Sequence, residues 1–284
     1  MSATCLPLSV INKQFPGLPI IKASRIYVES PEVLAEFAKL KNPVMPDLEE
    51  CRDVEIAFWY NGETLPDFRI GSLTILDANS RARVAGHMPS VKCLTVRNLG
   101  LTGFNKVFPN LRETTCIDSR ITEQMLNEFP GGRLSLYEGI VAPAKINHDR
   151  FTGLVLSNQQ GQLHLRFATE FAMLHIENRF AVDISASDIK TLSVNGMGVG
   201  RLYCNIQQSR RVYLQSLELQ KSSSFTANLV VMYNVSAESC AGLTAHACYT
   251  ACSTGTSDMN SRVLHVNPRD MHRLIPDLSE LLDL

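Results

Sequence analysis

Three cysteines and one histidine toward the carboxyl end of the chain could bind a metal ion. Cys240, His246, Cys248 and Cys252 supply thiolate and imidazole, the ligand types of structural zinc sites. Their spacing lacks the paired CxxC knuckles of most zinc sites, and the neighbouring alanines and glycine suit buried thiols. We therefore predict no metal and no other cofactor, with zinc at these four positions as the alternative.

Two carboxylates, Asp118 and Glu138, could together cleave a glycosidic bond. If they lie on successive turns of stacked strands, their side chains are about 5 Å apart, the separation in a retaining glycosidase. Parallel β-helices do host polysaccharide-cleaving enzymes, which is an analogy of fold alone. No histidine or arginine cluster joins this column, and Asn98 and Asn158 continue it. We predict that the protein is not an enzyme and keep a parallel β-helix carbohydrate-active enzyme as the third functional hypothesis.

A further set of residues lies at alternate positions of the expected strands, on the face that points away from the core. Tyrosine and arginine are favoured anchors at protein interfaces. The predicted partner-binding residues are Arg97, Arg133, Tyr137, His175, Arg211 and Tyr213. Glu177, Asn195 and Gln215 share this face, so we expect a protein partner to bind here.

The elements that position these residues come from a sequence repeat. An apolar pattern φxxφxφ recurs, with starts between Cys51 and Thr226 that are 17 to 21 residues apart. Such regular spacing is typical of a solenoid, in which each coil cannot bury its own apolar face and must stack on its neighbours. The matches are Leu18-Ile21-Ala23, Cys51-Val54-Ile56, Ile70-Leu73-Ile75, Val91-Leu94-Val96, Leu111-Thr114-Cys116, Gly131-Leu134-Leu136, Phe151-Leu154-Leu156, Phe171-Leu174-Ile176, Ile189-Leu192-Val194, Ser209-Val212-Leu214, Thr226-Leu229-Val231 and Ser261-Leu264-Val266.

Several rows of the repeat resemble leucine-rich repeats. The rows are MPSVKCLTVRNLGL (88–101), FPNLRETTCIDSRI (108–121) and FPGGRLSLYEGIV (129–141), and the resemblance is to the superfamily as a whole. It implies a parallel solenoid that presents a strand face to another protein. The asparagine that the family places three residues after the last apolar strand position is absent.

One residue earlier, a different polar column takes its place. Asparagine and aspartate tolerate turn conformations and hydrogen-bond to the local backbone. The column therefore predicts a ladder at the corner of the coils. Its members are Asp77, Asn98, Asp118, Glu138, Asn158 and Asn178.

We predict one domain whose class changes from α/β to mainly β along the chain, with about 11–12 coils of about 20 residues. Short helices are expected after Ser30 and over 122–129, whereas from about residue 151 a second apolar triplet in each coil predicts strands on both sides. The predicted parts are a cap segment (1–17), solenoid repeats (18–235), an inserted loop (236–260), and a last coil with a capping helix (261–284). The apolar stripe Leu274, Ile275, Leu278, Leu281 and Leu282 predicts that helix.

The composition excludes several classes of partner. The 27 basic and 28 acidic residues give a net charge of −1, without the basic excess of a nucleic-acid-binding protein. No secretory signal and no run of apolar residues long enough to span a bilayer are found, so no membrane association is expected. Eight cysteines scattered among apolar neighbours are typical of reduced thiols, which predicts an intracellular protein, cytoplasmic or nuclear.

The favoured functional hypothesis is therefore a non-enzymatic scaffold or adaptor that binds another protein through the exposed strand face. The alternative is a structural subunit of a large assembly, such as a viral capsid or a multiprotein particle.

Overall fold

A computed structural model describes residues 5–7, 25–39, 53–68, 71–100, 102–237, 242–255 and 260–277. These residues form a parallel β-solenoid of about 11 turns, with about 19 residues in each turn. The chain divides into two compact units, Met1–Arg120 with Glu128–Gly132, and Ile121–Asn127 with Arg133–Leu284. The predicted class, a mainly parallel β-solenoid, is confirmed.

The first unit is a stack of short parallel strands. In sheet order these are β1 (Cys5–Pro7), β2 (Arg25–Val28), β3 (Asp53–Ile56), β5 (Ser72–Ile75), β7 (Cys93–Arg97) and β8 (Glu113–Ile117). Their register aligns Val54 with Leu73, Leu73 with Leu94, and Leu94 with Thr114, as the repeat predicts. The sheet already begins at β1, inside the segment that was predicted to be a cap.

The return side of these coils is short and partly helical. It contains α2 (Pro31–Ala38), β4 (Thr64–Leu65), β6 (Ala85–Gly86) and α3 (Phe104–Val107). The predicted cap is present, because the Ser30 hydroxyl accepts a hydrogen bond from the Val33 amide at 3.3 Å. The second predicted helix is α4 (Glu123–Glu128), which follows β9 (Arg120–Ile121).

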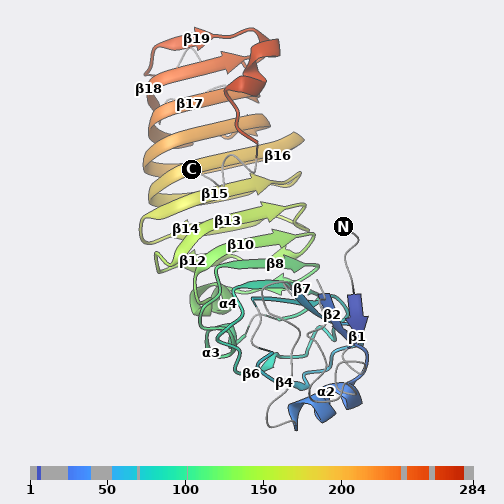
Figure 1. Cartoon of the computed structure of the whole chain (residues 1–284). Coiled ribbons are helices and arrows are strands. Elements are labelled where there is room, and N and C mark those ends of the chain that lie inside the picture. The colour runs from blue at the N-terminus through green and yellow to red at the C-terminus, as the bar shows by residue number, and fades with distance from the viewer. Residues whose placement is uncertain are drawn as a thin grey trace. The chain divides into compact units, whose positions relative to one another are not determined.

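The second unit has long strands that wrap round the coil (Figure 1). Its main sheet runs through β10 (Gly132–Tyr137), β13 (Phe151–Ser157), β15 (Phe171–Glu177), β16 (Val182–Leu219), β17 (Ser224–Ser236), β18 (Gly242–Ala251) and β19 (Val263–His265). β11 (Ile140–Val141) pairs with β9. On the other side, β12 (Ala144–Ile146) pairs with β14 (Leu163–Phe167), and β14 pairs with β16. The predicted strands on both sides of the coil are confirmed.

The core of the second unit is a column of stacked aliphatic side chains. Leu154 is in register with Leu174, and Leu174 with Leu192, and all three are completely buried. Each buried leucine stabilises the fold by roughly 1.5–3 kcal/mol relative to an exposed one. Phe151 and Phe171, on successive turns, form an aromatic contact with ring centroids 5.9 Å apart and ring planes tilted by 51°.

The corner column adopts the left-handed backbone conformation. Asn98, Asp118, Glu138 and Asn158 have φ between 51° and 57°, a region that asparagine and aspartate enter more readily than most residues. Met197, Ser216, Asn234 and Cys252 have the same conformation at later corners. Asp77 and Asn178 do not have a positive φ. The Asn178 side chain instead donates a hydrogen bond from Nδ2 to the Gly161 carbonyl at 3.3 Å. The ladder is therefore mainly a feature of backbone conformation.

The predicted inserted loop 236–260 is wrong, because its central part, Gly242–Ala251, is strand β18. Phe225 is in register with Leu243, and Val230 with Cys248. Leu243, Ala245 and Cys248 are buried, so the small residues that suggested a loop fill the core of a coil.

The last two rows of the repeat were predicted one residue out of register. The inward residues of β17 are Val230 and Met232, both completely buried, and the predicted Leu229 and Val231 face the other side. In β19, Val263 follows Cys248 in the core column, and Leu264 is exposed. A register irregularity between Ile206 and Ser209 precedes this change. The first predicted row, Leu18-Ile21-Ala23, lies outside the described residues.

The predicted capping helix is also wrong for the part that the structure describes. Residues Pro268–Arg273 form a 3-10 helix, capped by the Asn267 side chain, and Leu274 and Ile275 follow in a turn and a bend. Met271, 2% exposed, packs with Tyr213, Val231 and Ala251 on the outer face of the strands. This C-terminal segment (Pro268–Asp277) thus covers the strand face, and Leu278, Leu281 and Leu282 lie outside the described residues.

Candidate ligand site on the outer strand face

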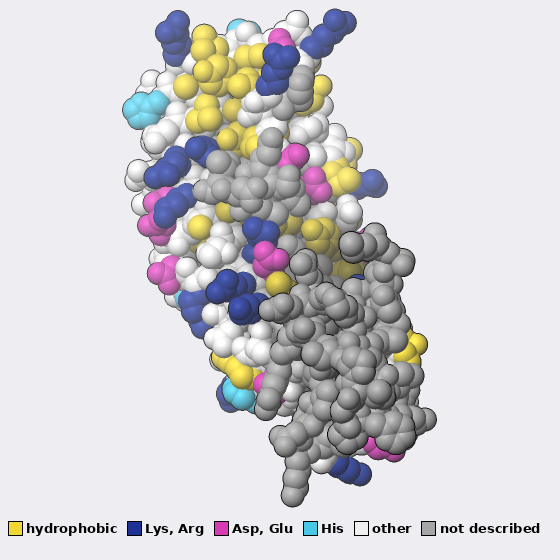
Figure 2. Space-filling model, viewed as in Figure 1, with side chains coloured by type: hydrophobic (Ala, Val, Ile, Leu, Met, Phe, Trp, Pro, Cys, Tyr) yellow, Lys and Arg dark blue, Asp and Glu magenta, His cyan; other side chains and the backbone are white. Residues whose placement is uncertain are grey.

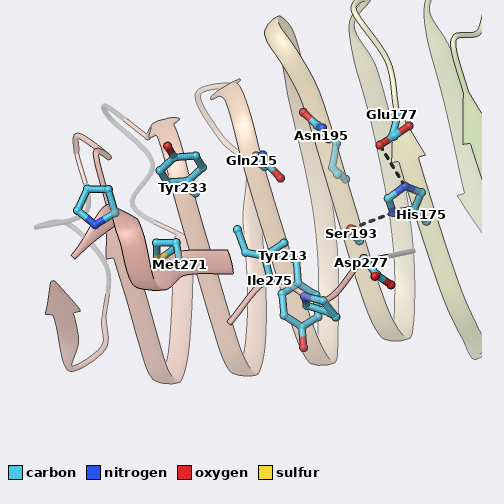
Figure 3. Close-up of a pocket in the computed structure, with 13 residues that line it drawn as sticks. His175, Glu177, Ser193, Asn195, Tyr213, Gln215, Tyr233, Met271, Ile275 and Asp277 are labelled. Atoms are coloured by element: carbon cyan, nitrogen blue, oxygen red, sulfur yellow. Dashed lines mark hydrogen bonds and ion pairs between the residues drawn. The ribbon is translucent and has the colours of Figure 1, made fainter. Parts of the chain in front are cut away.

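The outer face of the second unit contains a pocket of about 560 Å³. Strands β15, β16 and β17 form its floor, and the C-terminal segment forms a wall (Figure 3). This volume lies within the usual range of small-ligand sites. The lining residues are His175, Glu177, Ser193, Val194, Asn195, Tyr213, Gln215, Tyr233, Pro268, Met271, Ile275, Pro276 and Asp277.

The strand period of two places the floor side chains in rows. His175 is in register with Ser193 on the neighbouring turn, and both lie between the two core positions of their strands. A second row begins two residues later, where Glu177 is in register with Asn195 and Gln215 with Tyr233. Figure 3 shows this second row crossing successive coils, so the sheet itself fixes the spacing of its polar groups.

His175 is a buried histidine with one satisfied ring nitrogen. Its Nδ1 hydrogen-bonds to the Ser193 hydroxyl at 3.0 Å, and the side chains of both residues are buried. Its Nε2 lies 3.8 Å from the Glu177 Oε1 atom, which is too long for a hydrogen bond. Nε2 has no hydrogen-bond partner among the described residues. The imidazole therefore presents one unused polar atom beside a carboxylate.

Glu177 is held as a carboxylate. Its interaction with His175 lowers the pKa of the Glu177 carboxyl, against the opposing effect of partial burial. The Ser157 hydroxyl, which donates a hydrogen bond to Oε2 at 3.3 Å, lowers the pKa further. The group is ionised at neutral pH and places a negative charge at the pocket.

The wall of the pocket is apolar where it meets the sheet. Tyr213 is 6% exposed beneath Met271, with Ile275 packed beside it. Burial raises the pKa of the Tyr213 hydroxyl, and the nearby Arg211 charge opposes this effect. Figure 2 shows apolar side chains gathered over β17 and β18 at this end of the unit. The C-terminal segment docks because it covers this apolar surface.

The structure brings together only part of the predicted partner-binding set. His175 and Tyr213 line the pocket, and Arg211 lies beside Tyr213. Arg133 and Tyr137 are half-buried on β10 of the same unit and do not line it. Arg97 belongs to the other unit, where it lies 3.9 Å from Asp118 in an exposed ion pair.

Sequence reasoning missed Tyr233 and the whole C-terminal wall. Tyr233 follows the inward Met232, but the one-residue error of register in β17 placed it wrongly. The signal that could have corrected this error is the pair Val230 and Met232, which fits the inward positions as well as Leu229 and Val231 do. The sequence of the C-terminal segment contains no such signal, because its apolar residues fit a capping helix as well as they fit a segment that packs on the strand face.

The four candidate zinc ligands do not gather in the part of the chain that the structure describes. Cys248 points into the core, where burial raises its thiol pKa to about 11 and disfavours the thiolate that zinc requires. His246 and Cys252 are exposed, and Cys240 lies outside the described residues. Among those residues, no three histidine, cysteine, aspartate or glutamate side chains are placed to hold a metal.

Asp118 and Glu138, the candidate catalytic carboxylates, are exposed corner residues that belong to different units. The left-handed backbone explains why a polar residue stands at each position.

The fold and this site define a parallel β-solenoid with a pocket on its outer strand face. Comparison of the chain with models of protein families, with curated proteins and with solved structures gives no match. None of the helices in the described ranges is long and apolar enough to cross a membrane.

Proposed function

We propose that the protein is a non-enzymatic scaffold or adaptor that binds a partner protein through the outer strand face of its second unit. The observation that carries this proposal is the pocket between that face and the C-terminal segment. It combines tyrosine and histidine with amide and carboxylate groups. In binding sites, aromatic residues typically supply most of the contact energy, and a few polar groups orient the ligand and make binding specific.

The rigidity of the floor supports a binding role. Each lining side chain of the floor projects from a strand that is hydrogen-bonded into the parallel sheet, so a partner need not order a loop. A preorganised surface loses less conformational entropy on association and therefore binds more tightly for the same contacts.

The surroundings of Ser193 favour binding over catalysis. Ser193, His175 and Glu177 are the residue types of a nucleophilic triad, but Ser193 lies within a regular strand in register with His175. Backbone N–H groups in such a strand are engaged in the sheet, whereas acyl transfer requires free donors that stabilise an oxyanion.

We extend the proposal to the class and location of the protein. The repeat pattern supports a divergent leucine-rich repeat, and a protein partner is proposed rather than nucleic acid or membrane because the net charge is close to zero. Cys93, Cys116, Cys204, Cys248 and Cys252 are not joined in disulfides, and three of them, Cys116, Cys204 and Cys248, are buried, which supports an intracellular protein.

A structural subunit of a larger assembly is the second candidate, and one observation favours it. β19 (Val263–His265) is the terminal strand of the sheet among the described residues, with Leu264 37% exposed. A strand at the edge of a sheet can pair with another chain. If the subunit hypothesis is right, the purified chain should self-associate in analytical ultracentrifugation, and an adaptor should remain monomeric.

The scaffold proposal is tested by blocking the pocket floor. Asn195→Arg with Gln215→Arg fills the pocket with two long side chains, and Gln207→Arg with Gln208→Arg makes the same change at exposed positions of β16 outside it. In proximity labelling and co-purification from the native source, the first variant should lose a defined partner that the control retains. If neither variant loses a captured partner, the proposal is contradicted.

A further inference from the structure

We infer that the pocket on the outer strand face receives a cationic side chain, the ammonium of a lysine or the guanidinium of an arginine from the partner protein. This inference rests on the proposed function and names the chemistry of the group that enters the site. It is carried by the charges that line the pocket and by the unused polar atoms that face it.

The lining of the pocket is acidic. Glu177 and Asp277 contribute carboxylates, and no lysine or arginine is among the lining residues that the structure describes. Arg211 lies beside Tyr213 but does not line the pocket. A cation therefore gains electrostatic attraction here, whereas an anionic ligand would be repelled.

The Glu177 carboxylate has capacity for a further donor. Oε2 accepts one hydrogen bond from Ser157, and Oε1 faces His175 at 3.8 Å without a direct hydrogen bond to it. An ionised carboxylate can accept about four hydrogen bonds. A cationic N–H donor makes a shorter and stronger bond with it than a neutral donor does.

His175 supports this carboxylate from the floor of the pocket. Its Nε2 atom is buried without a hydrogen-bond partner among the described residues and lies 3.8 Å from Glu177 Oε1. In the tautomer that agrees with the lowered Glu177 pKa, Nδ1 accepts a hydrogen bond from the Ser193 hydroxyl and Nε2 carries the proton. The imidazole then keeps Glu177 ionised, and the other acceptor positions of the carboxylate remain for a cationic donor.

The remaining lining suits the stem and the periphery of a basic side chain. The Asn195 and Gln215 side-chain amides continue the row from Glu177 across the next two coils (Figure 3). Asn195 Oδ1 accepts a hydrogen bond from the Met197 backbone N–H at 3.0 Å and keeps one further acceptor position. The ring of Tyr233 can attract a cation through its π face, and the half-buried Ile275 offers an apolar surface to the methylene stem.

A metal ion is the poorer occupant. No group of three metal-ligating side chains occurs among the described residues. A pocket of about 560 Å³ is also much larger than the coordination shell of one ion, whose ligands lie about 2–2.6 Å away.

The experiment titrates the purified full chain with N-acetyl-L-arginine amide, N-acetyl-L-lysine amide and N-acetyl-L-citrulline amide. Citrulline has nearly the shape of arginine without its charge. Binding is followed by NMR chemical shifts of the His175 imidazole and of backbone amides in β15 and β16. Chemical-shift titration detects binding with dissociation constants in the millimolar range, which is the affinity expected for a single side-chain analogue.

We expect the arginine or lysine probe to shift these signals and the citrulline probe to bind at least about tenfold more weakly. Glu177→Gln should weaken binding of the cationic probe by at least about tenfold. Glu170→Gln removes the same charge from an exposed residue that pairs with Lys190 outside the pocket, and should leave binding unchanged.

Equal binding of citrulline, an unchanged affinity in Glu177→Gln, or no shift with either cation would overturn the inference. The partner-capture experiment remains separate. If capture depends on Asn195 and Gln215 but the cationic probes do not bind, the scaffold proposal stands and only the nature of the anchoring group is wrong. If the probes bind and no partner is lost from the blocked variant, the scaffold proposal fails instead.

Discussion

The imidazole Nδ1 of His175 lies 3.0 Å from the hydroxyl of Ser193, and the two residues are paired across adjacent turns of the solenoid. Both side chains are buried, although they project from the outer face of the sheet. An outward histidine is therefore held in one orientation by its neighbour on the next turn. The candidate site depends on this arrangement, because it directs Nε2 toward Glu177.

Ser193→Ala should destabilise the second unit by about 1–3 kcal/mol, because it leaves a buried ring nitrogen without a partner. Ser187→Ala, at an exposed position of the same strand, is the matched control and should change the free energy of unfolding by less than about 0.5 kcal/mol. Urea denaturation monitored by circular dichroism measures both. Equal effects of the two substitutions would show that the His175–Ser193 contact adds no stability.

Glu177→Gln should make the stability of the protein less sensitive to acid. The pKa of Glu177 is lowered in the folded state from its ordinary value of 4.5, so the carboxylate stabilises the fold above that value. This contribution is lost as the pH falls through the lowered folded-state pKa. Denaturation midpoints measured from about pH 6 to pH 3 should thus fall more steeply for the wild type than for the variant. Parallel curves would contradict the assigned shift.

Glu138→Gly should stabilise the protein by up to about 1 kcal/mol, because glycine adopts the left-handed conformation without the steric cost of a Cβ atom. Glu138→Val should be destabilising, since a β-branched residue enters this region least readily. Thermal denaturation of the two variants measures the difference. A loss of stability in the glycine variant would mean that the Glu138 side chain contributes more than its backbone conformation costs.

Met271→Asp should release the C-terminal segment from the strand face, because a charge would be buried against Tyr213, Val231 and Ala251. Trypsin should then cleave after Arg269 and Arg273 faster than in the wild type, as seen by mass spectrometry of timed digests. Arg262→Asp, at an exposed position outside the docked segment, should not accelerate these two cleavages. Unchanged cleavage in Met271→Asp would show that the segment is held by other contacts.

The repeat itself was predictable, because each coil places its inward residues at the same offset. Leu154, Leu174 and Leu192 follow one another at nearly constant spacing, and parallel strands in register require that spacing. The prediction failed at β17. A register irregularity between Ile206 and Ser209 changes the offset between β16 and β17, and the local pattern of β17 fits two frames. Only pairing with the neighbouring strand distinguishes them.

The segment around Cys248 shows a second limit. Its small residues match a loop by composition, yet Leu243, Ala245 and Cys248 fill a coil because the preceding strand offers an edge on which to pair. Hydrogen bonding to that edge outweighs the weak intrinsic strand preference of alanine and glycine. Composition alone contains no information about the edge.

The sequence by itself determined the solenoid, its period, the strands on both sides of the later coils and the polar corner residues, since all of these follow from periodic local patterns. Tertiary structure alone decided where the site lies. The C-terminal segment packs on Tyr213, which lies more than fifty residues earlier in the chain, and in doing so it buries part of the strand face and forms the wall of a pocket beside His175 and Glu177. A contact of this kind depends on which apolar surface remains uncovered once the coils have stacked, and that surface exists only in the folded chain.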